Sequence, residues 1–475
     1  MKKNNTIRDF LVVSFGNVIA LLANILVGFV LPMVLNVENY GYYKIYTLYI
    51  SYIGLLHFGF VDGILLLFAG RDYEDLDREG FRLYTRFFAL VECVLSVLGI
   101  IGSSLLLQGQ MRIIIVFVFL NLIWTNLTLY FQYVSQATCR FKELAMRKTI
   151  NAILTFCLVI SLFFTWKANS ESVILSCYFY ITASQIISIG LLVWYITTYK
   201  EIVFGKAANF SSEKKTILRI FKKGFVLTIA YEVSRLVLVM DRQFVSILFD
   251  IDTYAKYAFA YNILSCVTAL ITGVSTVMFP KLKKMSREDA VAIFPKSMAL
   301  VTIFVCVAQL GYYPIRHIVI WLLPKYQESL TYFRIIFPVL ALTSCITIIV
   351  FTFYKILDKN NVFFAVCTIS LVVAFIANVI AYILWQTPQA ISWASLIATI
   401  FWYLLSVFYL SRKFQVEWKK NFIYAIIMIM VFYISTSFPQ SEGISIVAYL
   451  AALLIVTFLF YKNEFRKKQY KAHKN

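Results

Sequence analysis

Runs of roughly twenty apolar residues, the length that a helix needs to cross a bilayer, recur along the whole chain. We count fourteen such runs, the first at 10–35 and the last at 444–461. Because a lipid core holds no water to satisfy backbone polar groups, each run is expected to be a helix. The first run is too long for a signal-peptide core, so we interpret it as a retained span. The pattern predicts an all-α polytopic membrane protein with about 14 transmembrane helices.

The composition agrees with this pattern, since 61% of the residues are hydrophobic and only 14% are charged, which excludes a soluble globular chain. The net charge of +20 would suit a nucleic-acid partner, but its placement indicates otherwise. Of the 44 Lys and Arg residues, 35 lie at the chain ends or in alternate gaps between spans. The positive-inside rule assigns these gaps and both termini to the cytoplasm. We therefore expect the excess charge to contact the lipid bilayer, and we expect no nucleic-acid partner.

The seventh apolar run, 219–249, carries charged residues in a segment that is otherwise able to cross the membrane. A charge at mid-membrane costs roughly 2.5 to 3.5 kcal/mol on insertion scales, so these side chains must face protein or water. At about 100° per residue, one polar stripe holds Thr228, Glu232, Arg235, Arg242 and Ser246. We interpret Arg235 and Arg242 as a surface that binds an anion in transit, with Glu232 beside them. The alternative is that Glu232 and Arg235 only neutralise each other.

Other spans repeat polar residues at the spacing of one helix face. The first span carries Asn17 and Asn24, the fourth carries Thr128 and Gln132, and the row of the eighth begins at Tyr261. Since a lipid-facing surface does not carry such rows, we expect these helices to line a polar cavity. Together with Glu232, Arg235 and Arg242, these five residues form the predicted substrate-binding set. The alternative for each of them is a contact that lets two helices approach and hydrogen-bond.

Three titratable residues inside the second and third spans are candidates for coupling transport to an ion gradient, namely His57, Asp62 and Glu92. Glu92 is the carboxylate most isolated from basic neighbours in the sequence, so it is the first candidate to bind and release a proton. The alternatives are a packed, hydrogen-bonded histidine and a structural hydrogen bond from Glu92 to a neighbouring helix. The eight cysteines show no CxxC or metal-ligand spacing, so we expect no metal site and no cofactor.

The outer end of the first span repeats at the outer end of the seventh at a constant offset of 214 residues. The matched pairs are Asn36 and Asp250, Val37 and Ile251, Glu38 and Asp252, Tyr40 and Tyr254, and Tyr43 and Tyr257. Six spans separate the copies, so both have the same orientation, as in transporters with two similar lobes and a substrate site between them. We therefore predict two six-helix lobes in a pseudo-two-fold, V-shaped arrangement, followed by two further helices. Their predicted bounds are 1–199 for the first lobe, 200–223 for a cytoplasmic linker, 224–410 for the second lobe, and 411–475 for the last two helices and a basic tail.

Four short motifs relate the chain to a known family: VENYGYY at 37–43, LLHFGFVDG at 55–63, MDRQFV at 240–245 and VMFPKLKK at 277–284. With these motifs, and in span number and topology, the chain resembles Wzx-type polysaccharide or O-antigen flippases. This family belongs, with multidrug extruders, to the multidrug/oligosaccharidyl-lipid/polysaccharide exporter superfamily.

The resemblance implies an alternating-access flippase in a bacterial inner membrane. Its substrate would be an undecaprenyl-pyrophosphate-linked oligosaccharide, such as an O-antigen repeat unit, moved from the inner to the outer leaflet. Cation-lined cavities are typical of such proteins, and Arg235 and Arg242 would supply the cations here. A polysaccharide polymerase and a chain-length regulator are the candidate partner proteins.

Two other functions compete with this one. A membrane glycosyltransferase or polysaccharide polymerase would use Asp250 and Asp252, a DxD pair, to bind a metal and a sugar phosphate, but the internal repeat already explains this pair. Such enzymes also need a sizeable outer loop, which the span pattern lacks, so we do not expect an enzyme. A multidrug extruder of the same fold would favour twelve spans and embedded acidic sites. Fourteen spans and paired arginines favour an anionic lipid.

Overall fold

The computed structural model describes residues 21–169, 172, 175–283, 287–357, 359–437 and 442–472. Within these ranges the regular elements are all helical, which confirms the predicted all-α class. The chain forms two compact units, Met1–Val239 with Asp250–Ala258, and Met240–Phe249 with Phe259–Asn475. Helices α8 (Phe210–Leu248) and α9 (Ile251–Lys283) each pass from the first unit to the second. The predicted lobe bounds at 199, 223 and 410 stay a prediction.

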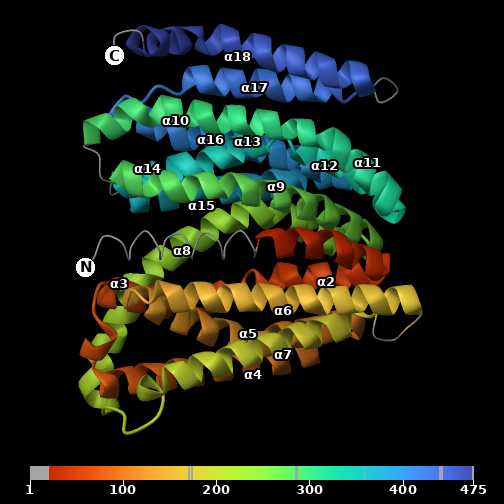
Figure 1. Ribbon diagram of the computed structural model, residues 1–475. Helices are drawn as coiled ribbons and strands as arrows, with labels where there is room; N and C mark the ends of the chain where they lie inside the picture. The colour runs from red at the N-terminus through yellow and green to blue at the C-terminus, as the bar shows by residue number, and fades with distance from the viewer. Residues whose placement is uncertain are drawn as a thin grey trace. The chain divides into compact units, whose positions relative to one another are not determined.

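The first unit is a bundle in which α4 packs on α5, and α5 and α6 pack on α7, as Figure 1 shows. A helix at Leu21–Val34 precedes the remaining elements. These are α2 (Val37–Ile50), η1 (Ile53–His57), α3 (Phe60–Phe68), η2 (Tyr73–Asp75), α4 (Arg78–Leu106), α5 (Gly109–Ala137), α6 (Phe141–Ala168), α7 (Cys177–Thr198) and η3 (Lys200–Ile202).

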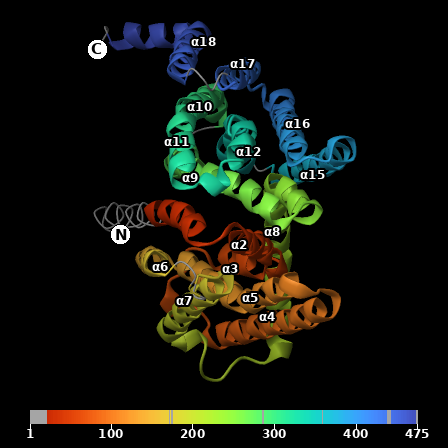
Figure 2. The ribbon, with the colours of Figure 1, turned by 90° about the vertical axis from the view of Figure 1, so that its right-hand side faces the viewer.

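The second unit contains the remaining helices, among which α15 pairs with α16 and α17 pairs with α18 (Figure 2). Its first elements are α10 (Arg287–Ala308), η4 (Gln309–Gly311), α11 (Tyr312–Leu322), η5 (Pro324–Tyr326) and α12 (Ser329–Ile336). The others are α13 (Leu340–Ser344), the π-helix η6 (Cys345–Val350), α14 (Phe351–Ile356), α15 (Asn360–Trp385), α16 (Pro388–Phe414), α17 (Lys419–Ser435) and α18 (Glu442–Ala472).

Capping residues in the sequence set the start of several helices. The Asn36 side chain accepts a hydrogen bond of 2.8 Å from the backbone N–H of Asn39 at the start of α2. Thr387 caps α16 in the same way, and Pro388 occupies the first turn, where a missing N–H costs nothing. At the C-terminal end of α15, Gln386 adopts a left-handed conformation with φ of 49°, which ends the helix.

Two spans are broken rather than straight. The segment Val37–His57 and α3 are bent by 56°, and the break contains Phe58 at φ 47° and Gly59 at φ 82°. These two left-handed residues end η1 and redirect the chain into α3. The second break, of 50°, separates α12 from Leu340–Ile356 and contains Pro338, which has no N–H to continue a helix.

Eight helices in the described ranges are long and apolar enough to cross a membrane, or up to ten if each bent pair is one span. The chain is therefore a multi-pass membrane protein, and the predicted number of fourteen spans stays a prediction. Helix α8 begins at Phe210, so the second half of the predicted linker 200–223 is helical, and the bounds of that linker stay a prediction. The Glu and Lys residues in this part of the linker are good helix formers. Their polarity ends the apolar run but does not end the helix.

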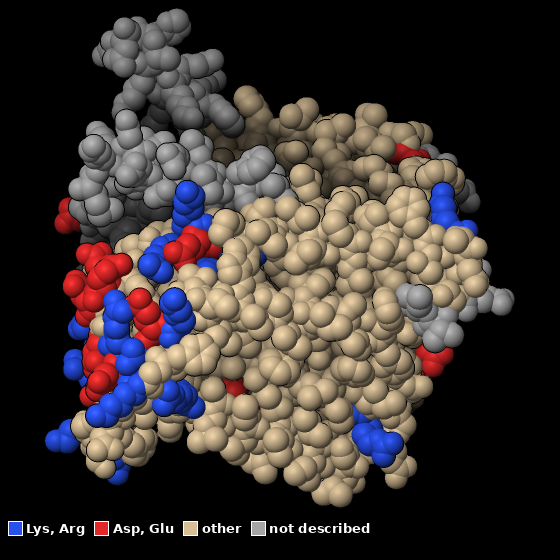
Figure 3. All heavy atoms as spheres, turned by 60° about the horizontal axis from the view of Figure 1, so that its bottom comes forward, with Lys and Arg blue, Asp and Glu red and all other residues tan. Residues whose placement is uncertain are grey.

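Charged side chains gather at one end of the face that Figure 3 shows, and most of this face carries neither acidic nor basic residues. Apolar side chains of α4 are largely exposed, for example Leu90 at 64% and Leu105 at 79%, as expected for a surface that contacts lipid. At the charged end of α4, Arg78 pairs with Glu201. Arg82 donates to the Glu201 carbonyl at 2.8 Å, which fastens the turn after α7 onto α4.

An aromatic core fixes α3 within the first unit. Phe60 is fully buried and stacks on Phe88 of α4, with ring centroids 5.1 Å apart. On the other side of α5, Phe131 stacks on Tyr195 of α7 at 6.0 Å. This core holds the first turn of α3 and the polar residues near it in a fixed place against α4 and α5.

Candidate functional site

Helices α3 and α8 cross at glycines in the first unit. A Cβ atom on Gly224 of α8 would overlap the carbonyl oxygen of Gly59, and one on Gly63 would overlap the carbonyl oxygen of Ile220. The two backbones therefore touch directly, because no side chain stands between them. This contact brings the polar residues on either side of the crossing into hydrogen-bonding range.

Asp62 and Thr228 meet at this crossing, 166 residues apart in the sequence. The Thr228 hydroxyl donates to Asp62 Oδ2, and it also lies 3.1 Å from the Gly224 carbonyl. Both side chains are buried. A buried carboxyl needs such a donor, since an unpaired one would lose its hydration without compensation.

His57 joins this group from the end of η1, on the other side of the bend that precedes α3. Its Nδ1 accepts a hydrogen bond of 3.1 Å from the backbone N–H of Gly59, so the proton of a neutral ring is on Nε2. That Nε2 lies 3.9 Å from Asp62 Oδ2, and His57 is only 5% exposed. The structure thus brings together His57 and Asp62, which the sequence proposed separately, and adds Thr228 as their link to α8.

Glu232 and Arg235 form an ion pair one turn further along α8, with Arg235 Nη2 at 2.7 Å from Glu232 Oε2. The Glu232 side chain is 13% exposed, whereas that of Arg235 is 42% exposed. A Cβ atom on Gly54 would lie 2.9 Å from Glu232 Oε1, so this carboxylate reaches the η1 segment. The pairing that the sequence offered as an alternative is present, and the Arg235 side chain stays partly exposed.

Arg242 belongs to the second unit, since the division of the units falls inside α8 after Val239. Its guanidinium carbon lies 4.6 Å from the centre of the Tyr261 ring, at cation–π distance. The Tyr261 hydroxyl donates to Asp241 Oδ2, and the backbone N–H of Arg242 donates to Asp241 Oδ1 at 2.8 Å. Asp241 is buried and accepts hydrogen bonds from the Arg242 backbone and from Tyr261. Tyr261 therefore contacts both the Arg242 guanidinium and the Asp241 carboxylate.

Glu92 is fully buried between α4 and α5. Its Oε2 accepts a hydrogen bond of 2.9 Å from Asn126 Nδ2, which also lies 3.5 Å from the Ile53 carbonyl. Among the described residues, Glu92 Oε1 and Asn126 Oδ1 have no hydrogen-bond partner. Sequence reasoning missed Asn126, because it lies off the polar row of α5 to which Thr128 and Gln132 belong.

The remaining predicted binding residues are more scattered. Asn24 is exposed and Gln132 is half-buried, whereas Thr128 is buried with an Oγ1 that has no hydrogen-bond partner among the described residues. Asn17 lies outside the described residues.

The described ranges contain no group of three or more His, Cys, Asp or Glu residues that could hold a metal ion. The assignment of all these residues to substrate or ion stays a prediction.

Comparison with known proteins gives one family match and several similar folds. The family model described as a polysaccharide biosynthesis protein matches residues 6–286. The solved structure of the lipid II flippase MurJ, in an inward closed conformation, superposes with a TM-score of 0.70 at 16% identity and covers 97% of this chain and 100% of that chain. A multidrug resistance MATE family transporter of the MOP superfamily, in an inward-facing conformation, gives a TM-score of 0.55 at 13% identity, with coverage of 88% and 95%.

A MOP superfamily transporter from Pyrococcus furiosus gives a TM-score of 0.54 at 9% identity, with coverage of 90% and 96%. At such identities the likeness shows the fold alone. A search among curated proteins finds no match.

Proposed function

Because the chain belongs to the polysaccharide biosynthesis protein family and has the fold of MOP superfamily transporters, we propose that it is a flippase for a lipid-linked oligosaccharide. The substrate is a polysaccharide repeat unit, such as that of an O-antigen, on undecaprenyl pyrophosphate. It moves from the inner to the outer leaflet of a bacterial inner membrane by alternating access, and both chain termini lie in the cytoplasm. A polysaccharide polymerase and a chain-length regulator act downstream as partners.

The observation that carries this proposal is the partly exposed side chain of Arg235 on α8, the helix of the seventh apolar run. Its side chain is 42% exposed, and its ion pair with Glu232 involves Nη2. An arginine within a membrane span is costly unless it faces protein or water, and its planar fork matches a phosphate. Arg242 supplies a second cation two turns further along α8, held on the face of Tyr261. Each arginine is proposed to attract the anionic pyrophosphate of the substrate.

Transport against a gradient needs an energy source, and the buried acids of the first unit are the candidates for it. Asp62 accepts from Thr228 across the contact of α3 with α8, and His57 lies beside it. A proton on Asp62 or Glu232 would change the charge balance of the same helix that carries Arg235. Glu92 is a third candidate, enclosed between α4 and α5 with a single amide donor.

A vesicle assay tests the role of the arginines. Full-length protein is reconstituted with a lipid-linked oligosaccharide, and the glycan that reaches the opposite leaflet is measured with a glycosidase that cannot cross the membrane. We expect Arg235→Ala and Arg242→Ala each to lower the initial rate by about tenfold or more, the effect of losing a charge-assisted hydrogen bond. Lys413→Ala, which removes an exposed cation at the end of α16, is the matched control. Normal flipping by both arginine variants would remove these residues from the mechanism.

A multidrug extruder is the second candidate function, because the MATE transporter shares this fold. The two functions differ in the charge of the cargo, since lipophilic cations would be repelled by Arg235 and Arg242. Efflux of a fluorescent cationic dye from the same vesicles, without flipping of the lipid-linked sugar, would favour the extruder.

A catalytic role for the DxD pair has less support. Asp250 caps α9, because its Oδ1 accepts from the Thr253 backbone N–H at 2.8 Å and its Oδ2 accepts from the Thr253 hydroxyl at 2.9 Å. Both carboxylate oxygens are thus engaged in starting a helix. The structures similar to this chain include a lipid II flippase and a MATE family transporter.

A further inference from the structure

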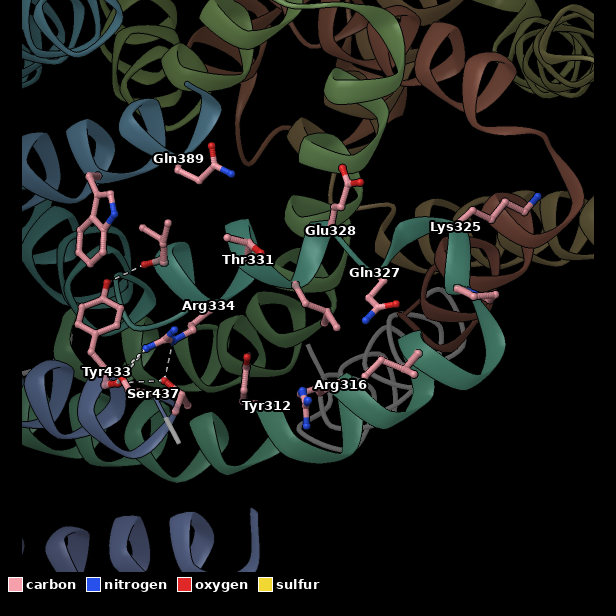
Figure 4. A pocket seen from close by; sticks show the side chains of 16 residues that line it. Tyr312, Arg316, Lys325, Gln327, Glu328, Thr331, Arg334, Gln389, Tyr433 and Ser437 are labelled. Carbon is pink, nitrogen blue, oxygen red and sulfur yellow. Dashed lines mark hydrogen bonds between the residues drawn. The ribbon is translucent and has the colours of Figure 1, made fainter. Parts of the chain in front are cut away.

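The second unit contains an open cavity of about 850 Å³ that lies outside the predicted substrate-binding set. Residues of α11, η5, α12, the first turns of α16 and the end of α17 line it. Three cations line it, Arg316, Lys325 and Arg334, against one carboxylate, Glu328. Figure 4 shows Arg334 and Arg316 approaching the same space from α12 and α11, with Tyr312 between them. The excess of positive charge indicates an anionic ligand.

Arg334 is the best placed of these cations. Its Nε donates to Thr436 Oγ1 at 2.9 Å, and its Nη2 donates to the Tyr433 carbonyl at 3.1 Å and to Ser437 Oγ at 2.7 Å. These partners are all neutral, so they hold the guanidinium in place without balancing its charge. Its Nη1 group has no hydrogen-bond partner among the described residues. A fixed arginine with two donors to spare is suited to bind a phosphate.

Arg316 is held differently, because it pairs with Glu442 at the start of α18. The same carboxylate lies 2.6 Å from His317 Nε2. Glu442 thus balances part of the charge on Arg316 and orients its side chain, which is 26% exposed. Arg316 is therefore a secondary cation of the cavity, and Arg334 is the primary one.

An apolar groove of about 570 Å³ between α15 and α16 adjoins this cavity, and the two share Gln389 and Trp393. The groove is lined by small and aliphatic residues together with Trp385. Several of these apolar side chains are exposed, including Ile380 at 49% and Ile397 at 61%. Tryptophans at the junction of a polar and an apolar region are typical of the membrane interface.

We propose that the cavity and the groove together bind one anionic phospholipid of the bilayer. The phosphodiester contacts Arg334 Nη1 with Arg316 nearby, the polar headgroup fills the cavity beside Gln389, and an acyl chain lies in the groove along α15 and α16. Continuity of the two spaces favours a lipid over a free anion, because a soluble phosphate has no apolar part that could occupy the groove. Both volumes lie within the roughly 300 to 1,000 Å³ of typical ligand sites. The site does not rest on the proposed function, and its test measures binding only.

Quenching of Trp393 fluorescence tests the proposal in the full-length protein. The protein is placed in vesicles that contain brominated phosphatidylglycerol or brominated phosphatidylcholine, and the quenching that disappears in Trp393→Phe reports the site. We expect phosphatidylglycerol to quench this component at lower mole fraction, and Arg334→Ala to reduce the preference by about fivefold, the factor that one cation contributes near an anionic headgroup. Arg334→Lys keeps the charge and should retain part of the preference. Arg412→Ala, at the other end of α16, should leave it unchanged.

A second variant tests the groove independently of the arginine. Ala377 is a half-buried groove residue, so Ala377→Phe should fill the space and abolish Trp393 quenching by either lipid. Equal quenching of the wild-type protein by the two lipids would overturn the proposal. So would a preference that millimolar inorganic phosphate removes while Ala377→Phe leaves quenching intact, because the cavity would then bind a free anion.

Discussion

Gly224 of α8 lies so close to Gly59, which precedes α3, that a Cβ atom on Gly224 would overlap the Gly59 carbonyl oxygen. We expect Gly224→Ala to force the two helices apart and to destabilise the first unit by about 1 to 3 kcal/mol, as overpacking does elsewhere. A thermal unfolding curve in detergent, followed with a thiol-reactive dye, measures the change. Gly102→Ala is the control, because a Cβ atom at this position of α4 meets nothing within 4 Å. An equal unfolding midpoint for both variants would contradict the direct backbone contact.

The hydrogen bond from Thr228 to Asp62 should stabilise the same crossing. Thr228→Val keeps the shape of the side chain but leaves the buried carboxyl without this donor, at an expected cost of about 1 to 3 kcal/mol. Thr228→Ser keeps the hydroxyl and should recover most of the stability. Unfolding curves of the three proteins decide the matter, and a valine variant as stable as the wild type would show that the bond contributes nothing.

Glu92 and Asn126 should be energetically coupled, because among the described residues the Glu92 side chain accepts a hydrogen bond only from Asn126. A double-mutant cycle of Glu92→Ala and Asn126→Ala should give a coupling energy of about 0.5 to 3 kcal/mol. Glu92→Gln can still accept at one oxygen and should be milder than Glu92→Ala. Strictly additive effects would mean that the two side chains are independent.

Asp250 should stabilise the start of α9 as its N-cap. Asp250→Ala should cost about 1 kcal/mol, whereas Asp250→Asn keeps an acceptor and should cost less. The hydrogen bond from the Thr253 backbone N–H holds the pKa of the Asp250 carboxyl below its ordinary value of 3.8. The charge-dependent part of this stabilisation is therefore full above that value and is lost as the pH falls through the lowered pKa.

Unfolding curves recorded between neutral and acid pH measure this effect. The advantage of the wild type over Asp250→Ala should shrink at acid pH, while that of Asp250→Asn should stay constant. A wild-type advantage that does not change with pH would show that the charge of Asp250 contributes nothing to the capping.

The sequence predicted the local features of this fold well. The matched repeat residues Asn36 and Asp250 perform the same task, since each accepts from the backbone N–H three residues later, at 2.8 Å. Tyr40 and Tyr254, another matched pair, are both 1% exposed. The family resemblance read from short motifs is confirmed by the family match and by the folds of the MOP superfamily. The repeat and the helices were found from matched residues and periodicity, which are features of a few neighbouring residues.

Contacts between distant residues could not be predicted in the same way. The helical spacing of Glu232 and Arg235 allowed their ion pair to be weighed in advance, because both lie on one helix. No spacing linked Asn126 to Glu92, or Arg334 to the turn after α17, because these contacts depend on which helices pack together and at what angle. The cavity around Arg334 was missed for this reason.

The sequence by itself determined that the chain is a helical membrane protein, because lipid leaves an apolar segment no other way to satisfy its backbone. It also determined which side chains are too polar to face lipid. Only the tertiary structure decided what those side chains meet, since glycine contacts such as that of Gly224 with Gly59 set how closely two helices approach. The physical reason is that hydrophobic burial in a helix is a local property, whereas a hydrogen bond between helices exists only where packing brings donor and acceptor within about 3 Å.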